Sequence, residues 1–237
     1  GSLPNKPSRR LANLFNFRGP NFTIDAACGS ALAAVMTARN EILLGRIDAA
    51  VTGGLDSLMS SHGFVEFCKI GALTPDGSRP YSEGANGFLM GEGGGIVILK
   101  KLEDAVENGD HVYAIIRGVG GSSDGNGKGI TAPNPLGQKL AVERGLEDAK
   151  VSIETISFIE GHGTSTAVGD VAELNSLMEV FAGLPKHSIG LTSIKSQIGH
   201  LKSAAGIAGL IKATLAIEKQ IIPAQINFRG PNPYVDW

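Results

Sequence analysis

One cysteine and two histidines of this sequence combine reactive side chains with positions at the ends of apolar, strand-like segments. Cys28 follows the segment 22–27 and precedes a helical pattern that begins near Ser30. The unpaired N–H groups and the dipole of a helix N-terminus favour an anion, so we expect a lowered pKa for the Cys28 thiol. A thiolate is a nucleophile and a leaving group, which makes Cys28 the candidate nucleophile. The alternative is a buried thiol that only packs, and this is how we interpret Cys68.

The two histidines are placed along the chain in the same manner as the cysteine. His162 comes shortly after the apolar segment 156–159, and His200 comes shortly after the segment 189–193. Groups at the carboxyl ends of strands in an α/β sheet meet at one crevice. We therefore expect Cys28, His162 and His200 to face one another across that crevice.

The elements that must position these residues are short strand-like runs that alternate with helical patterns, which is typical of an α/β fold. Strands are expected at 22–27, 48–52, 96–99, 112–119, 156–160 and 189–193. Helices are expected at 30–44, 102–108, 138–149, 171–181 and 201–219, with a surface loop over 120–137. The last helix is apolar nearly all round and should be buried. Its Gly206 and Gly209 should let another helix approach closely.

Composition excludes several classes of protein. The 237 residues include 33 glycines without a three-residue period, 42% are hydrophobic and the net charge is −2. These values argue against a fibre, a disordered chain and a nucleic-acid-binding surface. No apolar run approaches the length of a membrane span, and two distant cysteines do not form a disulfide framework, so we expect a cytoplasmic protein. The glycine run 91–95 lacks the Lys-Ser/Thr of a phosphate loop and is interpreted as tight backbone packing.

The segments around the candidate residues resemble the signatures of β-ketoacyl synthases. In chain order they are DAACGSAL at 25–32, GALTPDGSRPY at 71–81 with GEG at 91–93, EGHGTST at 160–166, and KSQIGHL at 195–201. They occur in the family's order and at similar separations, over essentially the whole chain. The EGHGT form is similar to that of type I polyketide or polyunsaturated fatty acid synthase domains.

The resemblance implies a thiolase-like, layered αβαβα fold within the α/β class, usually assembled as a homodimer. Residues 1–110 would be the remainder of the N-terminal half, which carries the nucleophile. Residues 111–237 would be most of the C-terminal half, which carries both histidines. Compared with the family, the opening strands and the final glycine-rich segment are missing, so we expect a fragment that is incomplete at both ends.

The resemblance also implies an acyltransferase that catalyses decarboxylative Claisen condensation. An acyl group on Cys28 would be attacked by the carbanion of a malonyl-type extender after loss of CO₂. Both substrates would be carried on the phosphopantetheine of an acyl carrier protein or domain, with no bound cofactor and no metal. His162 and His200 are implied to donate N–H groups to the extender's thioester oxygen, where charge develops.

The resemblance suggests roles for neighbouring residues as well. Lys195 is expected to be buried near the site and to need a carboxylate partner, for which the resemblance points to Glu160. This pair would support His162 electrostatically, join two strands, or do both. Thr164 and Thr166 are implied to bind the pantetheine arm, whereas a helix-capping role is the alternative.

Other interpretations of the sequence stay open. A non-decarboxylative thiolase relative would need a second catalytic cysteine near the C-terminus, and this sequence has none there. A non-catalytic fragment, or a chain-length or scaffolding partner of a synthase, usually lacks the nucleophile, so Cys28 argues against it. A cysteine hydrolase would let water clear the acyl group from Cys28.

Overall fold

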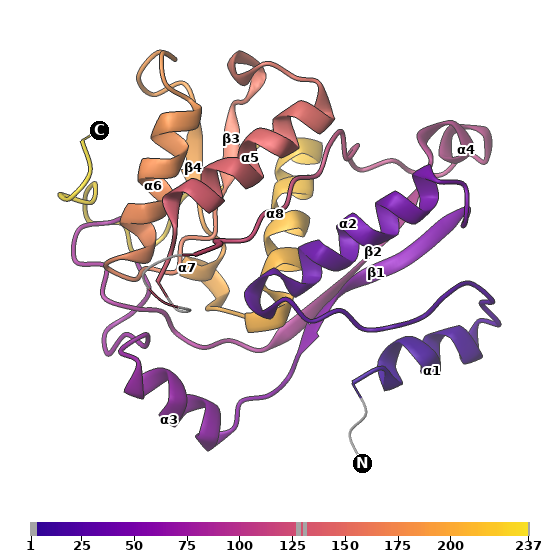
Figure 1. The fold of residues 1–237 in the computed structure, drawn as a ribbon, viewed down its shortest axis with the longest axis horizontal. Coiled ribbons are helices and arrows are strands. Elements are labelled where there is room, and N and C mark those ends of the chain that lie inside the picture. The colour runs from indigo at the N-terminus through magenta and orange to yellow at the C-terminus, as the bar shows by residue number, and fades with distance from the viewer. Residues whose placement is uncertain (1–3, 127–128, 130–131, 237) are drawn as a thin grey trace.

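A computed structural model describes residues 4–126, 129 and 132–236 (Figure 1). The N-terminal elements are α1 (Lys6–Leu14), the 3₁₀ turn η1 (Ala27–Gly29), α2 (Ser30–Leu43), β1 (Ala49–Asp56), α3 (Ser61–Lys69), β2 (Gly93–Lys100) and α4 (Leu102–Glu107). The C-terminal elements are α5 (Pro135–Ala149), η2 (Ile153–Thr155), β3 (Phe158–Glu160), α6 (Gly169–Val180), β4 (Gly190–Thr192), α7 (Lys195–Ile198), η3 (Lys202–Ala204) and α8 (Ala205–Lys219).

The strands form two pairs that α8 connects. β1 and β2 are antiparallel, with Ala49 opposite Lys100 at one end and Asp56 opposite Gly93 at the other. β3 and β4 are parallel, as the α/β pattern predicts. Helix α8 contacts β1, β2 and β3 as well as α2, and it lies between the two strand pairs in Figure 1. His162 follows β3 and His200 precedes α8. Because α8 contacts both β3 and the η1 turn before α2, it places the two histidines near the turn that carries Cys28.

The main core lies where α2, η3 and α8 meet the β1–β2 pair. Its buried members are Ala31, Val35, Leu201, Ala204 and Ile207, against which Val97 and Leu99 pack. Gly206 allows the close approach of α2, since a Cβ there would lie 2.7 Å from Leu32 Cγ, which confirms the prediction for this glycine. The neighbour of Gly209 is Glu160 of β3 and not a helix. Helix α8 is buried on one side only, because Ile217 is 62% exposed.

The glycine run before and within β2 packs closely against its neighbours. A Cβ on Gly91 would lie 2.5 Å from the carbonyl oxygen of Ile198, and one on Gly95 would lie 2.6 Å from Ile211 Cδ1. Real Cβ atoms do not approach other atoms so closely, so a side chain at either position would displace its neighbours. The interpretation as tight backbone packing is confirmed.

Several predicted elements differ from those in the structure. The predicted strands 22–27 and 112–119 are wrong. Residues 22–26 and 112–119 have no regular secondary structure, and Ala27 begins the 3₁₀ turn η1. A strand needs a hydrogen-bonded neighbour, and neither segment pairs with one among the described residues. The sequence patterns also missed α1, α3 and the four-residue α7. The predicted helix 201–219 is divided, because Lys202 at φ 51° places a 3₁₀ turn before α8. Part of the predicted loop 120–137 lies outside the described residues.

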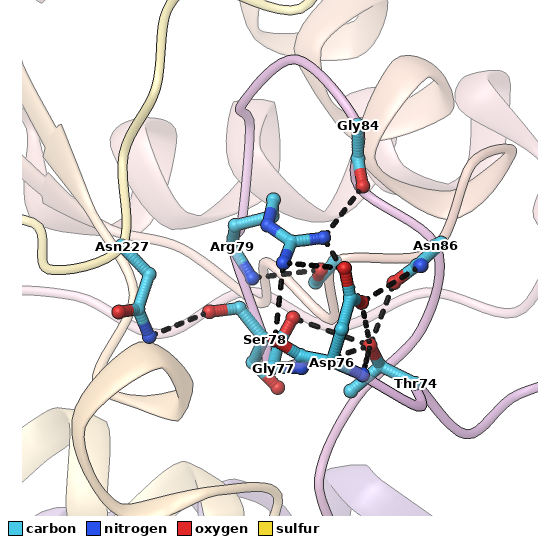
Figure 2. A network of polar contacts seen from close by, with 9 residues as sticks. Thr74, Asp76, Gly77, Ser78, Arg79, Gly84, Asn86 and Asn227 are labelled. Atoms are coloured by element: carbon cyan, nitrogen blue, oxygen red, sulfur yellow. Dashed lines mark hydrogen bonds and ion pairs between the residues drawn. The ribbon is translucent and has the colours of Figure 1, made fainter.

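A polar network fixes the segment that joins α3 to β2 (Figure 2). The buried Arg79 guanidinium pairs with Asp76 at 3.0 Å and donates to the carbonyl oxygen of Gly84 at 2.9 Å. Hydrogen bonds from Arg79, Asn86 and Thr74 hold the pKa of the Asp76 carboxyl well below its usual range. This network fixes the loop that delivers Tyr81 and Phe88 to the two histidines described below.

The described part of the chain shows neither a membrane-spanning helix nor a metal cluster. Within those residues, no helix has both the length and the apolar character needed to cross a bilayer. The same residues contain no group of three or more His, Cys, Asp or Glu side chains placed to hold a metal ion.

Candidate active site

The turn that carries Cys28 is held by hydrogen bonds from its immediate neighbours. Asp25 Oδ1 accepts from the amide of Ala27 at 3.0 Å. Ser30 Oγ accepts from the amide of Ala26 at 2.8 Å and donates to the carbonyl oxygen of Ala27 at 2.7 Å. Ala27 has a φ of 49°, a conformation that residues with a side chain rarely adopt. These contacts hold the thiol at the start of α2.

The protonation state of Cys28 differs from the prediction. Burial raises the pKa of the Cys28 thiol above its ordinary value, and the Asp56 carboxylate acts in the same direction. The Lys195 and Lys202 ammonium groups act in the opposite direction, but they do not outweigh burial. The expectation of a lowered pKa is therefore wrong, because desolvation of the thiolate exceeds the stabilisation that nearby positive charges give. Cys28 therefore rests as a thiol.

His162 and His200 lie side by side, as the sequence predicts. Their ring centroids are 5.7 Å apart, and the planes of the rings are nearly perpendicular. His200 is enclosed at 2% exposure, whereas the His162 residue is exposed to solvent. Their separation is short enough for one substrate oxygen to be reached from both rings.

The protein backbone fixes the tautomer of His200. The amide of Lys202 donates to His200 Nδ1 at 2.9 Å. A neutral imidazole whose Nδ1 accepts a hydrogen bond carries its proton on Nε2, so Nε2 is the donor. The amide of His200 itself donates to the carbonyl oxygen of Leu89 at 2.7 Å, and the Phe88 ring centroid lies 4.8 Å from that of His200. The imidazole is thus oriented by backbone and aromatic contacts.

Both imidazoles are neutral at physiological pH. Burial, and after it the Lys195 ammonium, lowers the pKa of His162 to about 4. Burial lowers the pKa of His200 still further, and the positive charges of Lys195 and Lys202 add to the effect. A neutral imidazole carries one N–H group that donates a hydrogen bond and does not dissociate at physiological pH. This is the state needed to stabilise a developing negative charge.

The predicted ion pair between Lys195 and Glu160 is wrong. Glu160 Oε2 pairs with Lys212 Nζ of α8 at 2.7 Å and accepts from Thr192 Oγ1 at 2.7 Å. Lys195 Nζ donates instead to the carbonyl oxygen of His162 at 2.6 Å. The difference arises because α8 packs against β3 and places Lys212 next to the Glu160 carboxylate. Lys195 remains buried next to both imidazoles, where it supports the His162 loop.

Glu173 is a site residue that the sequence prediction missed. Its Oε1 accepts from the amide of His162 at 2.7 Å, and its Oε2 accepts from the amide of Gly163 at 2.8 Å and from Tyr81 Oη at 2.9 Å. Burial lowers the pKa of Lys195, and the Glu173 carboxylate opposes this effect more strongly than any other nearby charge. The available signal was an acidic residue on the helix that follows the His162 motif.

Thr164 and Thr166 lie on the His162 loop and contact each other. Their hydroxyl oxygens are 2.9 Å apart, and Thr164 is buried. Neither caps α6, whose N-cap is Val168 without a side-chain hydrogen bond. The capping alternative therefore does not apply, and both hydroxyls are satisfied locally.

The structure brings the predicted reactive residues into one neighbourhood. The η1 turn of Cys28 packs against both η3, which follows His200, and α8. The Lys195 ammonium influences Cys28, His162 and His200 alike, which requires proximity to all three. A half-buried thiol in the same neighbourhood as two neutral imidazoles, with a central helix that connects the two strand pairs, fits the class of condensing enzymes with the thiolase fold.

Comparison with known proteins identifies the family. Residues 1–105 match the model of the beta-ketoacyl synthase N-terminal domain, and residues 113–229 match that of the C-terminal domain. The chain belongs to the β-ketoacyl synthase family.

The chain is similar to domains of large synthases. It is 40% identical over 233 residues to the 6-methylsalicylic acid synthase of Aspergillus niger, covering 96% of this chain and 13% of that protein. It is 41% identical over 241 residues to one of the polyunsaturated fatty acid synthase subunits of a Thraustochytrium species, covering 100% and 9%. The chain thus spans a small part of these relatives.

Solved structures agree with this assignment. The ketosynthase from module 6 of the bacillaene synthase of Bacillus subtilis superposes with a TM-score of 0.94 at 37% identity, covering 97% of this chain and 41% of that one. The ishigamide ketosynthase/chain length factor superposes with a TM-score of 0.89 at 34% identity, covering 96% and 55%. The fold is that of the thiolase-like ketosynthases.

Proposed function

We propose that this chain carries the acyl-transfer and decarboxylative condensation chemistry of a ketosynthase domain in a polyketide or fatty acid synthase. The observation that supports this most is the pair of neutral imidazoles 5.7 Å apart, with Nε2–H of His200 as a fixed donor. Such a pair suits an oxyanion that forms between the rings, because the donors are already oriented before charge develops.

The first step is transfer of an acyl group to Cys28. The thiol loses its proton and attacks the carbonyl carbon of an acyl thioester. The bond from carbonyl carbon to Cys28 Sγ forms, the bond to the donor sulfur breaks, and the donor leaves as a thiol that takes up a proton. Nearby Lys195 favours the thiolate during attack.

The second step joins two carbon chains. A malonyl-type thioester loses CO₂, and the electron pair of the broken C–C bond forms a carbanion stabilised as an enolate on the thioester oxygen. N–H groups of His162 and His200 stabilise that oxygen. The carbanion then attacks the acyl-Cys28 carbonyl, the C–S bond breaks, and a 3-oxoacyl thioester leaves while Cys28 takes up a proton.

The same proposal includes the carriers of the substrates. We propose that both thioesters arrive on the phosphopantetheine of an acyl carrier protein or domain, and that Thr164 and Thr166 bind the pantetheine arm once it displaces their mutual hydrogen bond. Assembly as a homodimer belongs to this proposal as well, and sedimentation velocity measures it directly.

The acyl-transfer step can be tested by intact-mass analysis after incubation with a short acyl-pantetheine thioester. We expect one persistent acyl adduct that is absent in Cys28→Ala. The interpretation of Cys68 as a buried thiol is wrong, because Cys68 is exposed on α3. Since it lies outside the site, Cys68→Ala is a matched control. An adduct that disappears in Cys68→Ala, or no adduct on a folded sample, would contradict the proposal and favour a non-catalytic scaffold. An adduct that water removes rapidly would indicate a hydrolase.

A further inference from the structure

Asp56 and Lys202 form an ion pair beside the site. Asp56 ends β1 and Lys202 begins η3, and their Oδ1 and Nζ atoms are 3.0 Å apart. Both side chains are 15% exposed, so the pair is largely shielded from water. An ion pair in such surroundings is held more firmly than one on the surface, because less solvent competes for its charges.

Each member of the pair is also anchored by hydrogen bonds. Lys202 Nζ donates to the carbonyl oxygen of Gly91 at 2.8 Å, and Gly91 in turn donates its amide to the carbonyl oxygen of His200 at 3.0 Å. Ser203 Oγ donates to Asp56 Oδ2 at 3.0 Å. These contacts connect β1, the segment before β2 and η3 around the backbone of His200.

The backbone of Lys202 is strained, and this is what requires the anchors. Its φ of 51° lies in the left-handed region, which residues with a side chain rarely adopt. In that conformation its amide donates to His200 Nδ1 at 2.9 Å. Relaxation of Lys202 to an ordinary φ would turn this amide away and leave the imidazole free to change its tautomer or its orientation.

We propose that the Asp56–Lys202 ion pair is a positioning device that holds Lys202 in its left-handed conformation, and thereby holds Nε2–H of His200 toward the extender. This inference rests on the proposed role of His200 in decarboxylation. Neither residue of the pair is proposed to touch the substrate. The pair as a whole carries no net charge, because the Asp56 carboxylate balances the Lys202 ammonium.

A positioning role and a purely structural one predict different results. Loss of a structural tie would lower every activity and the stability together. Loss of His200 positioning would lower decarboxylation while leaving transfer of an acyl group to Cys28 intact. Misplacement of a reacting group by about 1 Å costs up to about 100-fold in rate. For Asp56→Asn and Lys202→Met we therefore expect CO₂ release from malonyl-pantetheine to fall by about 10- to 100-fold.

The variants have matched partners. Lys202→Arg keeps the charge and should retain most of the CO₂ release. Asp110→Asn removes the carboxylate of another ion pair, Lys100–Asp110, at 2.7 Å and away from the histidines, and should leave both rates unchanged. Acylation of Cys28, followed by intact mass, should shift in opposite directions in Asp56→Asn and Lys202→Met, because the two charges act oppositely on the pKa of Cys28. CO₂ release should fall in both variants.

A spectroscopic measurement separates this inference from the proposed function. The ¹⁵N resonances of His200 in the full chain report which ring nitrogen carries the proton. We expect a single Nε2–H tautomer in the native chain and in Lys202→Arg, and a mixture in Lys202→Met. An unchanged tautomer together with unchanged CO₂ release in both Asp56→Asn and Lys202→Met would overturn the positioning role. Absence of CO₂ release by the native chain would overturn the proposed function, and the resonances would still test the ion pair.

Discussion

The proposed chemistry of the site depends on imidazoles that stay neutral, and desolvation together with the Lys195 ammonium keeps them so. Because the pKa of His162 is lowered to about 4, the ring accepts a proton only at a pH well below the ordinary pKa of a histidine, which is about 6.5. We expect the rate of malonyl decarboxylation to be level from about pH 8 down to about pH 5.5. A loss of rate centred near pH 6.5 would contradict neutral imidazoles held by burial.

The same shift predicts how stability depends on pH. Between about pH 6.5 and pH 4 the unfolded chain binds a proton on His162 and the folded chain does not. The free energy of unfolding should therefore fall as the pH decreases through this window. Urea unfolding at several pH values measures this dependence. In His162→Gln, which cannot take up the proton, the free energy of unfolding should decrease less over this pH window. An equal decrease in both proteins would contradict the lowered pKa of His162.

Residues with reactive side chains were predictable, and their electrostatic surroundings were not. Cys28, His162 and His200 stood out because each follows a strand-like segment within a recognisable motif. The partner of Glu160 was not predictable, because Lys212 is distant in the sequence and only the crossing of α8 over β3 brings the two together. The pKa of Cys28 was mispredicted for a related reason: the helix N-terminus is visible in a sequence, but the depth of burial is not.

At the scale of elements, the buried Glu160–Lys212 pair joins β3 to α8. The side chains are 5% and 6% exposed, and Thr192 Oγ1 accepts from Lys212 Nζ at 2.8 Å. Lys212→Met would leave the Glu160 carboxylate buried without its cation. We expect this change to lower the free energy of unfolding by about 3–5 kcal/mol, as measured by urea denaturation.

Two comparisons make that prediction specific. The double variant Glu160→Gln with Lys212→Met removes both charges and should recover a large part of the loss. Lys139→Met removes one partner of the more exposed Lys139–Glu179 pair between α5 and α6 and should cost less than about 1 kcal/mol. A Lys212→Met variant as stable as Lys139→Met would show that the buried pair does not hold the two elements together.

Helices with a sustained apolar period were predictable, and length alone did not decide the outcome. The six-residue α4 was predicted, whereas the nine-residue α1 and α3 were missed. The patterns located α2, α5, α6 and most of α8, because each repeats its apolar positions over several turns. They missed the four-residue α7, which is too short to show a period. They also assigned strands to 22–27 and 112–119, where β-forming residues find no paired neighbour among the described residues.

At the scale of the whole molecule, the β1–β2 pair has two apolar faces with different surroundings. Val97 and Leu99 pack against the core, whereas Ile96 and Ile98 on the other face are 56% and 74% exposed. Strands that are apolar on both faces are typical of sheets covered on both sides. Substitutions on the exposed face therefore test whether another surface covers that face in solution.

Substitutions on the two faces should differ in cost. Ile207→Ala in the core, where the side chain is fully buried, should lower the free energy of unfolding by about 2–5 kcal/mol. Ile98→Ala should change it by less than about 0.5 kcal/mol. Thermal or urea unfolding of both variants at low protein concentration measures the difference. A cost for Ile98→Ala as large as for Ile207→Ala would show that this face is buried in solution.

The family, its fold and the partial extent of the domain followed from four ordered motifs, and comparison with solved structures gives the share that this chain covers. The chain covers 41% of the solved bacillaene synthase ketosynthase yet superposes with a TM-score of 0.94. Short motifs are enough to identify the family because each combines a reactive residue with the glycines and small residues that fix its backbone.

The central claim is that Cys28 and the two imidazoles together form a carbon–carbon bond. The most direct measurement is mass spectrometry of the products after the acyl-loaded chain is mixed with malonyl-pantetheine. We predict a 3-oxoacyl-pantetheine two carbons longer than the acyl group, loss of the acyl adduct from Cys28 and release of CO₂. His162→Ala should slow this reaction by about 10²–10³-fold while still accepting the acyl group. A native chain that is acylated and yet forms no 3-oxoacyl product would contradict the claim.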